Sequence, residues 1–153
     1  MQELDLSGLD ELIDRFGGIA KKIPQMRRDM HEALAERLKE AVDTEIAVSI
    51  NDSHGKIRSW QYKAVGKNGG YSAIRAINEP TGPNSPGAIT NYLENGHMTR
   101  GRAYGRSKSK RPKVKVNDVP GAHFYALVRG RIVSEVMSAA EDFLSKVAKE
   151  IKG

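Results

Sequence analysis

The chain has 153 residues, no cysteine and a formal net charge of +6. A chain of this length is most simply one domain with its own core, and the lack of cysteine excludes disulfides, thiolate metal sites and cysteine nucleophiles. The N-terminus, MQELDLSGLDELIDRF, is acidic and amphipathic, which a secretion signal is not. No stretch approaches the roughly twenty apolar residues of a membrane span. We therefore expect a protein of the cytoplasm that has no membrane partner.

The positive charge is concentrated in one segment. Between residues 100 and 115 the chain carries eight of its 25 basic residues and no acidic one. These eight are Arg100, Arg102, Arg106, Lys108, Lys110, Arg111, Lys113 and Lys115. Without them, 17 basic residues face 19 acidic ones, for a net charge of −2. A segment of this composition buries too little apolar surface to offset the loss of conformational entropy on ordering. We therefore predict a flexible basic arm at about residues 98–113.

Two amphipathic helices are predicted near the N-terminus. Apolar residues fall at i, i+3, i+4 and i+7 from Leu9 to Phe16, with Ser7 as the N-cap and Gly17-Gly18 as the stop. After Pro24 a longer apolar stripe predicts a helix from about 24 to 48. Its members are Met26, Met30, Ala33, Leu34, Leu38, Ala41, Val42 and Ile46. The two methionines could line an adaptable binding groove, but core packing is the favoured interpretation.

A β-hairpin is predicted next. The segments IRSWQYKAV and YSAIRAIN alternate with a period of two and are joined by GKNGG. This alternation places Arg58, Trp60, Tyr62 and Ala64 on one side of the first strand. The glycine-rich joint lacks the Gly-Lys-Ser/Thr ending and the following helix of a phosphate-binding loop, so it is interpreted as a turn.

The second half of the chain is predicted to contain a loop, a short helix, a strand and a long helix. The stretch NEPTGPNSPG is rich in proline and glycine and predicts a surface loop. Ser85-Pro86 then begins a short helix that Gly96 ends. The stretch VKVNDV predicts one short strand, and the apolar spacing after Pro120 predicts the longest helix of the chain, up to the C-terminus.

The order of these elements predicts an α+β fold. Two long amphipathic helices, one in the N-terminal region and one at the C-terminus, would pack on a small, mainly antiparallel sheet, with a long basic loop. We predict one domain over residues 1–153.

The search for a catalytic or metal site gives no convincing constellation. The four histidines are far apart in sequence, and only Glu94 and His97 have a suggestive spacing, which needs a second copy to form a metal motif. No Gly-x-Ser-x-Gly elbow is present, and most carboxylates lie on the polar faces of predicted helices. We therefore expect no catalytic, cofactor or metal site. A basic nuclease built on Glu94, His97 and the arginine run is the remaining enzymatic alternative.

The basic arm has three interpretations. Clustered cations with Tyr104 among them could neutralise phosphates and stack on a base. A single tyrosine provides little surface for base stacking, however. The flanking elements also match no known helix or sheet motif that binds nucleic acid. The arm could also be a solvated loop. We favour an assembly arm that meets an acidic surface on a neighbouring subunit.

Three motifs together resemble a known family. The turn NDSHGKIRSWQ resembles the D-T-G-x-L-R-x-S step of head-tail joining, or tail-completion, proteins of long-tailed double-stranded DNA phages. The stretch AITNYLENGH resembles that family's Tyr-x-x-x-x-Glu-x-Gly-(Thr/His) signature, and VPGAHFYALVRGRIVSEV resembles its entry into a closing helix. The resemblance covers nearly the whole chain.

The resemblance carries over residue by residue. Matches to the polar step are Gly55, Ile57 and Arg58, with Trp60 beside them as a further structural residue. Matches to the signature are Glu94, Gly96 and His97, and Phe124 matches the buried aromatic that begins the last helix. The sequence departs from the family pattern at Ser53-His54, where a threonine is usual, and it lacks Pro-Ala after Phe124. The proline-rich loop and the basic arm look like insertions.

What the resemblance implies is a structural virion protein rather than an enzyme. Such a protein is made in the host bacterial cytoplasm and assembles as a ring at the junction of head and tail, where it contacts other neck, connector or tail-tube proteins. Glu94, Gly96, His97 and the eight basic residues would then belong to an interface or an arm. The alternative is a basic nucleic-acid-binding protein, in which the arm contacts DNA.

Overall fold

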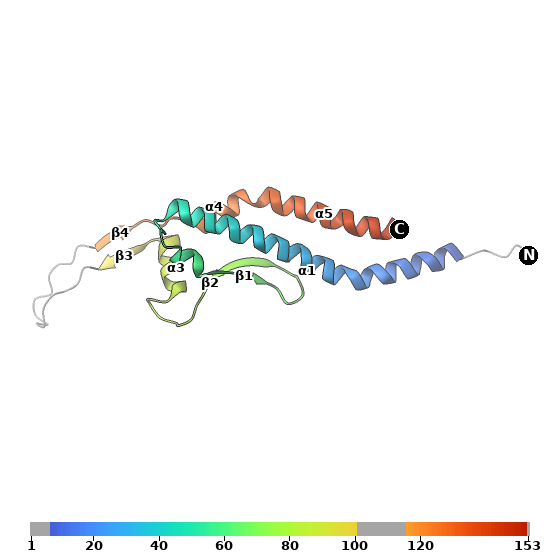
Figure 1. Ribbon diagram of the computed structural model, residues 1–153, viewed down its shortest axis with the longest axis horizontal. Coiled ribbons are helices and arrows are strands. Elements are labelled where there is room, and N and C mark those ends of the chain that lie inside the picture. Colours follow the sequence, from blue (N-terminus) through green and yellow to red (C-terminus); the bar gives the residue numbers. More distant parts are fainter. Residues whose placement is uncertain (1–6, 101–115, 153) are drawn as a thin grey trace, which may run out of the picture. The chain divides into compact units, whose positions relative to one another are not determined.

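The computed structural model describes residues 7–100 and 116–152 (Figure 1). It is an α+β structure, as the sequence predicts, with a long N-terminal helix, a C-terminal helix and two small antiparallel two-stranded sheets. By its internal contacts the chain divides into two compact units. Of the described residues, the first unit holds 7–40, 63–74 and 130–152, and the second holds 41–62, 75–100 and 116–129. The long N-terminal helix and the first pair of strands each contribute residues to both units, and the single domain stays a prediction.

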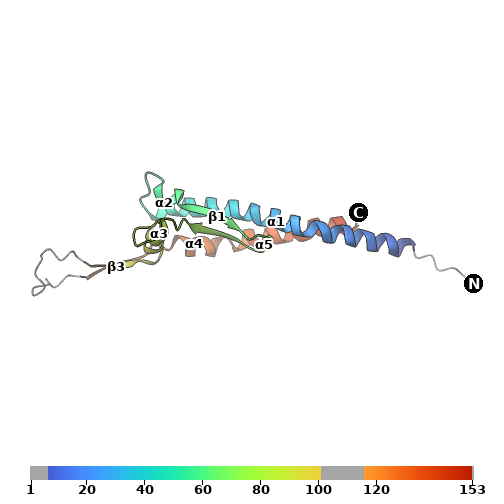
Figure 2. The same ribbon diagram turned by 90° about the horizontal axis from the view of Figure 1, so that it is seen from below.

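The first unit is built on two antiparallel helices. Helix α1 (Ser7–Ser49) and helix α5 (Val133–Lys152) run side by side in both Figure 1 and Figure 2. The Lys22 ammonium pairs with the Glu150 carboxylate at 2.7 Å, so the last turns of α5 lie against the first half of α1. Among the side chains that this unit buries are Ile19, Leu34 and Ala35 of α1.

The structure has one helix, α1, where the sequence predicts two helices separated near residue 17. That prediction is wrong. The helix continues through Gly17-Gly18 and through Pro24 without interruption. Glycine costs only about 1 kcal/mol in a helix and proline about 3 kcal/mol, so these residues are weak stops when packing favours continuity. Ile19 is buried directly after the glycines, and the ion pair of Lys22 follows it. Tertiary contacts therefore outweigh the local stop signals.

The predicted hairpin is confirmed, with a later start. Strand β1 (Gln61–Val65) pairs with strand β2 (Ser72–Ala76). The turn rests on α1, because the Arg27 guanidinium donates to the Asn68 carbonyl oxygen at 2.7 Å. Gly69 has φ +61°, and a Cβ there would lie 2.7 Å from the Arg28 Cα. A glycine is therefore required at this close approach.

Residues 57–60, which were predicted to begin the first strand, adopt a different structure. Arg58 lies in helix α2 (Lys56–Ser59), and Trp60 is the C-cap residue of this helix. The prediction that Arg58 and Trp60 share a strand face with Tyr62 is therefore wrong. A buried carboxylate, Asp52, binds the start of this helix and so overrides the alternation.

The second unit buries its own core. Ile46, Val42 and Phe124 are its largest fully buried side chains, and Val128 is 4% exposed. Helix α3 (Pro86–Asn95) follows the proline-rich loop. It leads into strand β3 (His97–Arg100), which pairs antiparallel with strand β4 (Val116–Val119), His97 opposite Val119 and Arg100 opposite Val116. The strand predicted from VKVNDV is thus confirmed over its second part.

The C-terminal region is divided where one helix was predicted. Helix α4 (Phe124–Arg131) ends before Ile132, and α5 begins at Val133. Gly130, a weak helix former, lies at this break. With 43 residues α1, rather than the C-terminal helix, is the longest helix of the described chain.

Candidate assembly surfaces

The signature residues meet where α3 ends. Ser85 caps the start of α3, its hydroxyl oxygen accepting a hydrogen bond from the Ala88 amide at 3.1 Å. Gly96 ends the helix with φ +79°, as predicted. A Cβ on Gly96 would lie 2.5 Å from the Val119 carbonyl oxygen, and a Cβ on Gly121 would lie 2.2 Å from the Glu94 carbonyl oxygen. The two glycines therefore allow the chain segments before and after the strand pair to cross in contact.

Glu94 holds the start of helix α4. Its side chain is buried, and its carboxylate accepts hydrogen bonds from the amides of Tyr125 at 3.0 Å and Ala126 at 3.2 Å. These are amides of the first turn of α4, which have no partner within the helix, and the positive end of the helix dipole favours a carboxylate there. The Glu94 carbonyl oxygen also accepts from the amide of His123, which has φ +55°. The Glu94 carboxylate thus faces α4, and the interface role predicted for this residue stays a prediction.

Phe124 lies at the centre of this junction. It is 0% exposed, which confirms the predicted buried aromatic, and its ring centroid lies 4.7 Å from that of Tyr125. The Tyr125 hydroxyl donates to the Gln61 side-chain oxygen, and the Gln61 amide donates to Thr90 at 3.3 Å. Burial, together with the negative charge of Glu94, raises the pKa of Tyr125 to about 12. The phenol therefore stays neutral in the ordinary pH range and serves to hold β1 to α4.

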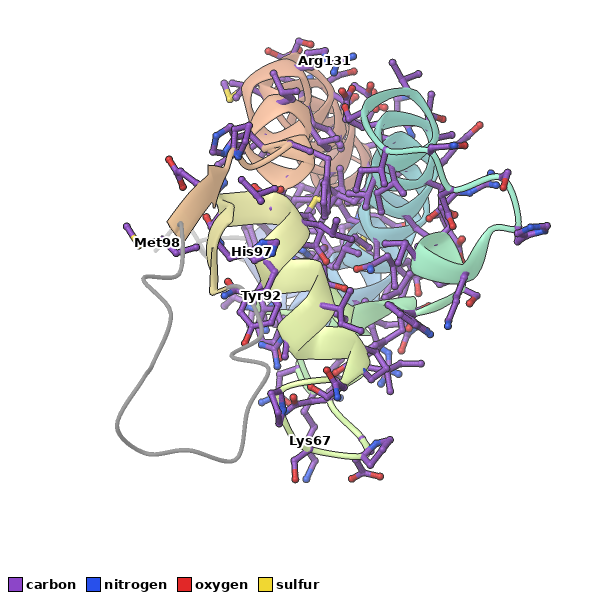
Figure 3. The ribbon with its side chains drawn as sticks, turned by 90° about the vertical axis from the view of Figure 1, so that its left-hand side faces the viewer. Lys67, Tyr92, His97, Met98 and Arg131 are labelled. Carbon is purple, nitrogen blue, oxygen red and sulfur yellow. The ribbon has the colours of Figure 1, made fainter. Side chains whose placement is uncertain are left out.

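His97 stands at the root of the β3–β4 ribbon. Its ring lies beside that of Tyr92, with 5.4 Å between ring centroids (Figure 3). Its Nδ1 atom is buried and has no hydrogen-bond partner in the described part of the chain. The next residue, Met98, is 73% exposed. Of the three signature residues, His97 is thus the one that belongs to the ribbon itself.

The ribbon replaces the beginning of the predicted arm. Met98 to Arg100 belong to β3 and pair with β4, where the sequence predicted a flexible segment. Backbone pairing with residues about twenty positions later stabilises them, and composition alone does not reveal that pairing. The remaining basic residues lie outside the described residues, and their predicted role stays a prediction. They are Arg102, Arg106, Lys108, Lys110, Arg111, Lys113 and Lys115.

The polar step is organised by Asp52, which is not among the residues matched to the family motif. Its carboxylate accepts from the amides of Ile57 at 3.0 Å and Arg58 at 3.1 Å, and from the Arg58 guanidinium at 3.2 Å. Burial acts to raise the pKa of Asp52, but these hydrogen bonds and the guanidinium charge hold it below its usual range. Gly55, with φ +65°, allows the turn between them. The sequence signal was present, since Asn, Asp and Ser in a turn commonly bond to nearby amides.

A separate groove lies in the first unit between α1 and α5. It encloses about 240 Å³. Its apolar lining consists of Met26, Met30, Ala33, Leu34, Ala139 and Phe143, and its charged rim consists of Asp29, Arg37, Asp142 and Lys146. Met26 and Met30 are half-buried and line this groove, whereas their place on the apolar stripe predicts packing in the core.

None of the comparisons with family models, curated proteins and solved structures found a match. Within residues 7–100 and 116–152, no group of three or more His, Asp or Glu side chains is placed to hold a metal ion. Of the helices described, none combines the length and apolar character needed to cross a membrane.

Proposed function

We propose that this chain is a structural component of a phage virion, a tail-completion or neck protein that assembles as a ring at the head-tail junction. In this role it contacts its own neighbours in the ring and docks to other neck, connector or tail-tube proteins. The proposal assigns no catalytic step to the protein.

The observation that carries the proposal is the junction of two motifs that are separate in sequence. The stretch around Glu94 and Gly96 and the stretch around Phe124 each resemble the same family. In the second unit the Glu94 carboxylate binds the amide of Tyr125, the residue after Phe124, and Gly96 crosses against Gly121. The residues that carry the resemblance thus form one structural element rather than scattered coincidences, which supports the family assignment.

The nuclease alternative lacks the same support. A catalytic Glu94–His97 pair would need a carboxylate free to contact substrate. The Glu94 carboxylate instead accepts two backbone hydrogen bonds inside the second unit. The geometry therefore favours a scaffolding role for this glutamate.

A ring requires contacts in which one surface of a subunit fits a different surface of the next. The β3–β4 ribbon is suited to such a contact, because residues 101–115, which connect its strands, hold seven of the eight clustered cations. We propose that this segment meets an acidic surface of a neighbouring virion protein, since complementary charge guides assembly and selects partners.

The test is complementation of a phage that lacks this gene. Changing Arg100, Arg102 and Arg106 to Glu is expected to leave a folded protein that fails to complete virions, because an acidic acceptor would now repel it. Infectious particles, free heads and free tails are counted. A normal yield of infectious particles would remove the arm from assembly.

A matched control separates position from total charge. Lys21, Lys67 and Lys149 are exposed lysines outside the arm, and changing all three to Glu alters the net charge equally. This control is expected to complement normally. DNA binding is measured in parallel, because a nucleic-acid grip that uses most of eight cations loses roughly a thousandfold in affinity from low to moderate salt. Normal assembly together with lost DNA binding in the arm variant would favour the DNA alternative.

A further inference from the structure

The first turns of α1 expose an apolar surface that the described chain leaves uncovered. Helix α5 ends at Lys152, whose carbonyl oxygen accepts a hydrogen bond from Arg15, and α1 continues past this point to Ser7 (Figure 1). Leu12, Ile13 and Phe16 are 42%, 57% and 50% exposed. We call these three residues the apolar end of α1. Phe16 follows Ile13 by three residues and Leu12 by four, which are the spacings of side chains on one docking face of a helix.

The α1–α5 groove offers a complementary site in the same unit. Its volume of about 240 Å³ is below the range typical of small-ligand pockets, roughly 300–1,000 Å³, and suits one or two apolar side chains. Methionines at Met26 and Met30 allow the lining to adapt to an inserted side chain. On its rim, Arg37, Asp142 and Lys146 make no hydrogen bond or ion pair with any residue that the structure describes.

A chain cannot fill its own groove with its own apolar end. Phe16 and Met26 lie on one continuous helix, about 15 Å apart along the axis at 1.5 Å per residue. The helix would have to break and reverse to bring them together. Any contact between the two surfaces is therefore a contact between two copies.

We propose that the apolar end of α1 in one copy binds in the α1–α5 groove of the next copy. Glu11 and Asp14 are exposed beside the apolar end, and in this pairing they meet the two cations of the groove rim, Arg37 and Lys146. The rim also carries two carboxylates, of which Asp29 accepts a hydrogen bond from Gln25 at 2.6 Å, and Asp142 is the second. Opposite charges at the rim of an interface fix its register and disfavour wrong partners.

This pairing is heterologous, because each copy supplies one surface to each of two neighbours. Repeated contacts of this kind close into a ring or continue as a filament. The inference deepens the proposed function, on which its biological setting rests, by assigning the residues that join adjacent subunits of the ring.

Engineered cysteines test the contact directly, since the natural chain has none. A Phe16→Cys chain is mixed with a Met30→Cys chain and oxidised mildly, and the products are separated without reductant. We expect a disulfide-linked pair that contains one copy of each chain. A disulfide needs Cα atoms within about 7 Å, so an accidental contact elsewhere does not produce it. A chain that carries both substitutions is expected to give a ladder of higher oligomers.

The matched control replaces Met30→Cys with Lys21→Cys, an exposed position on the same helix outside the groove. Folding of every variant is checked by circular dichroism. Absence of the Phe16–Met30 product between folded chains, or equal yield with the Lys21→Cys chain, would overturn the proposal.

A charge exchange gives a second, independent readout. Changing Arg37 and Lys146 to Glu in the Met30→Cys chain is expected to slow crosslinking by more than about tenfold, because like charges now face each other. Changing Glu11 and Asp14 to Lys in the Phe16→Cys chain is expected to restore the rate. No recovery in the exchanged pair would also count against the proposal.

The outcomes separate this inference from the proposed function. If the crosslinking test fails but the chain still completes virions, the proposed function stands and the contact between subunits lies elsewhere. A specific crosslink from a chain that plays no part in virion completion would leave the contact intact and remove the function.

Discussion

Glu94, Gly96 and Phe124 act at one junction although thirty residues separate the first from the last. The carboxylate binds the start of α4, the glycine permits the crossing with Gly121, and the aromatic ring fills the core beneath. Each is required for a different physical reason: charge at a helix end, absence of a side chain, and apolar volume. Their substitutions should therefore differ in kind as well as in size.

Phe124→Ala is expected to lower the free energy of unfolding by about 3–5 kcal/mol, because it leaves a cavity in the core of the second unit. Leu127→Ala on the same helix is the control, since Leu127 is 45% exposed. Urea unfolding measures both. Equal losses in the two variants would contradict the assignment of Phe124 to the core.

Asp52→Asn is expected to lower the free energy of unfolding by roughly 1–3 kcal/mol at neutral pH, because its hydrogen bonds are then only partly satisfied. The pKa of Asp52 is lower in the folded chain than in the unfolded chain. Its stabilising contribution is therefore complete above about pH 4 and is lost as the pH falls through the folded pKa. The wild-type and variant stabilities should converge at the acid end of a urea series. Glu141→Gln, an exposed site, should show no such convergence.

Among the secondary-structure elements, α1 owes its continuity to tertiary contacts. Gly17-Gly18 and Pro24 each weaken the helix locally, yet it continues because Ile19 and the ion pair of Lys22 hold the stretch between these positions to the first unit. The opposite holds at Gly96, where the glycine is a true stop. Its positive φ and its approach to Val119 leave no space for a side chain.

Gly17→Ala and Gly96→Ala should change stability in opposite directions. A Cβ at Gly17 would meet nothing within 4 Å, so alanine should raise the free energy of unfolding by about 0.5–1 kcal/mol through helix propensity. At Gly96 the same change should lower it, since a Cβ would lie 2.5 Å from the Val119 carbonyl oxygen. Thermal unfolding followed by circular dichroism measures both. A loss of stability at Gly17 would indicate that the helix ends there.

At the scale of the molecule, the division into two units raises the question of whether they unfold together. Helix α1 contributes Ser7–Glu40 to the first unit and Ala41–Ser49 to the second, and the hairpin β1–β2 is shared in the same way. Loss of one unit would therefore leave the shared helix and strands without part of their packing. This continuity favours cooperative behaviour.

We expect one unfolding transition for the whole chain. Trp60, the only tryptophan, reports on the second unit, and circular dichroism reports on helices of both units. Their urea transitions should coincide, as they do for a two-state domain. Fluorescence and circular dichroism midpoints that differ clearly would show two independent units and contradict the prediction of a single domain.

Features that depend on residues a few positions apart could be predicted from the sequence. These are the cap at Ser85, the stop at Gly96, the hairpin, the strand before Val119 and the confinement of excess positive charge to one segment. The continuity of α1, the internal contacts of Glu94 and the groove lined by Met26 and Met30 became visible only in the folded chain. The reason is physical: caps and turns are closed by neighbouring backbone groups, whereas burial and the partners of a carboxylate depend on residues that folding brings together from distant parts of the chain.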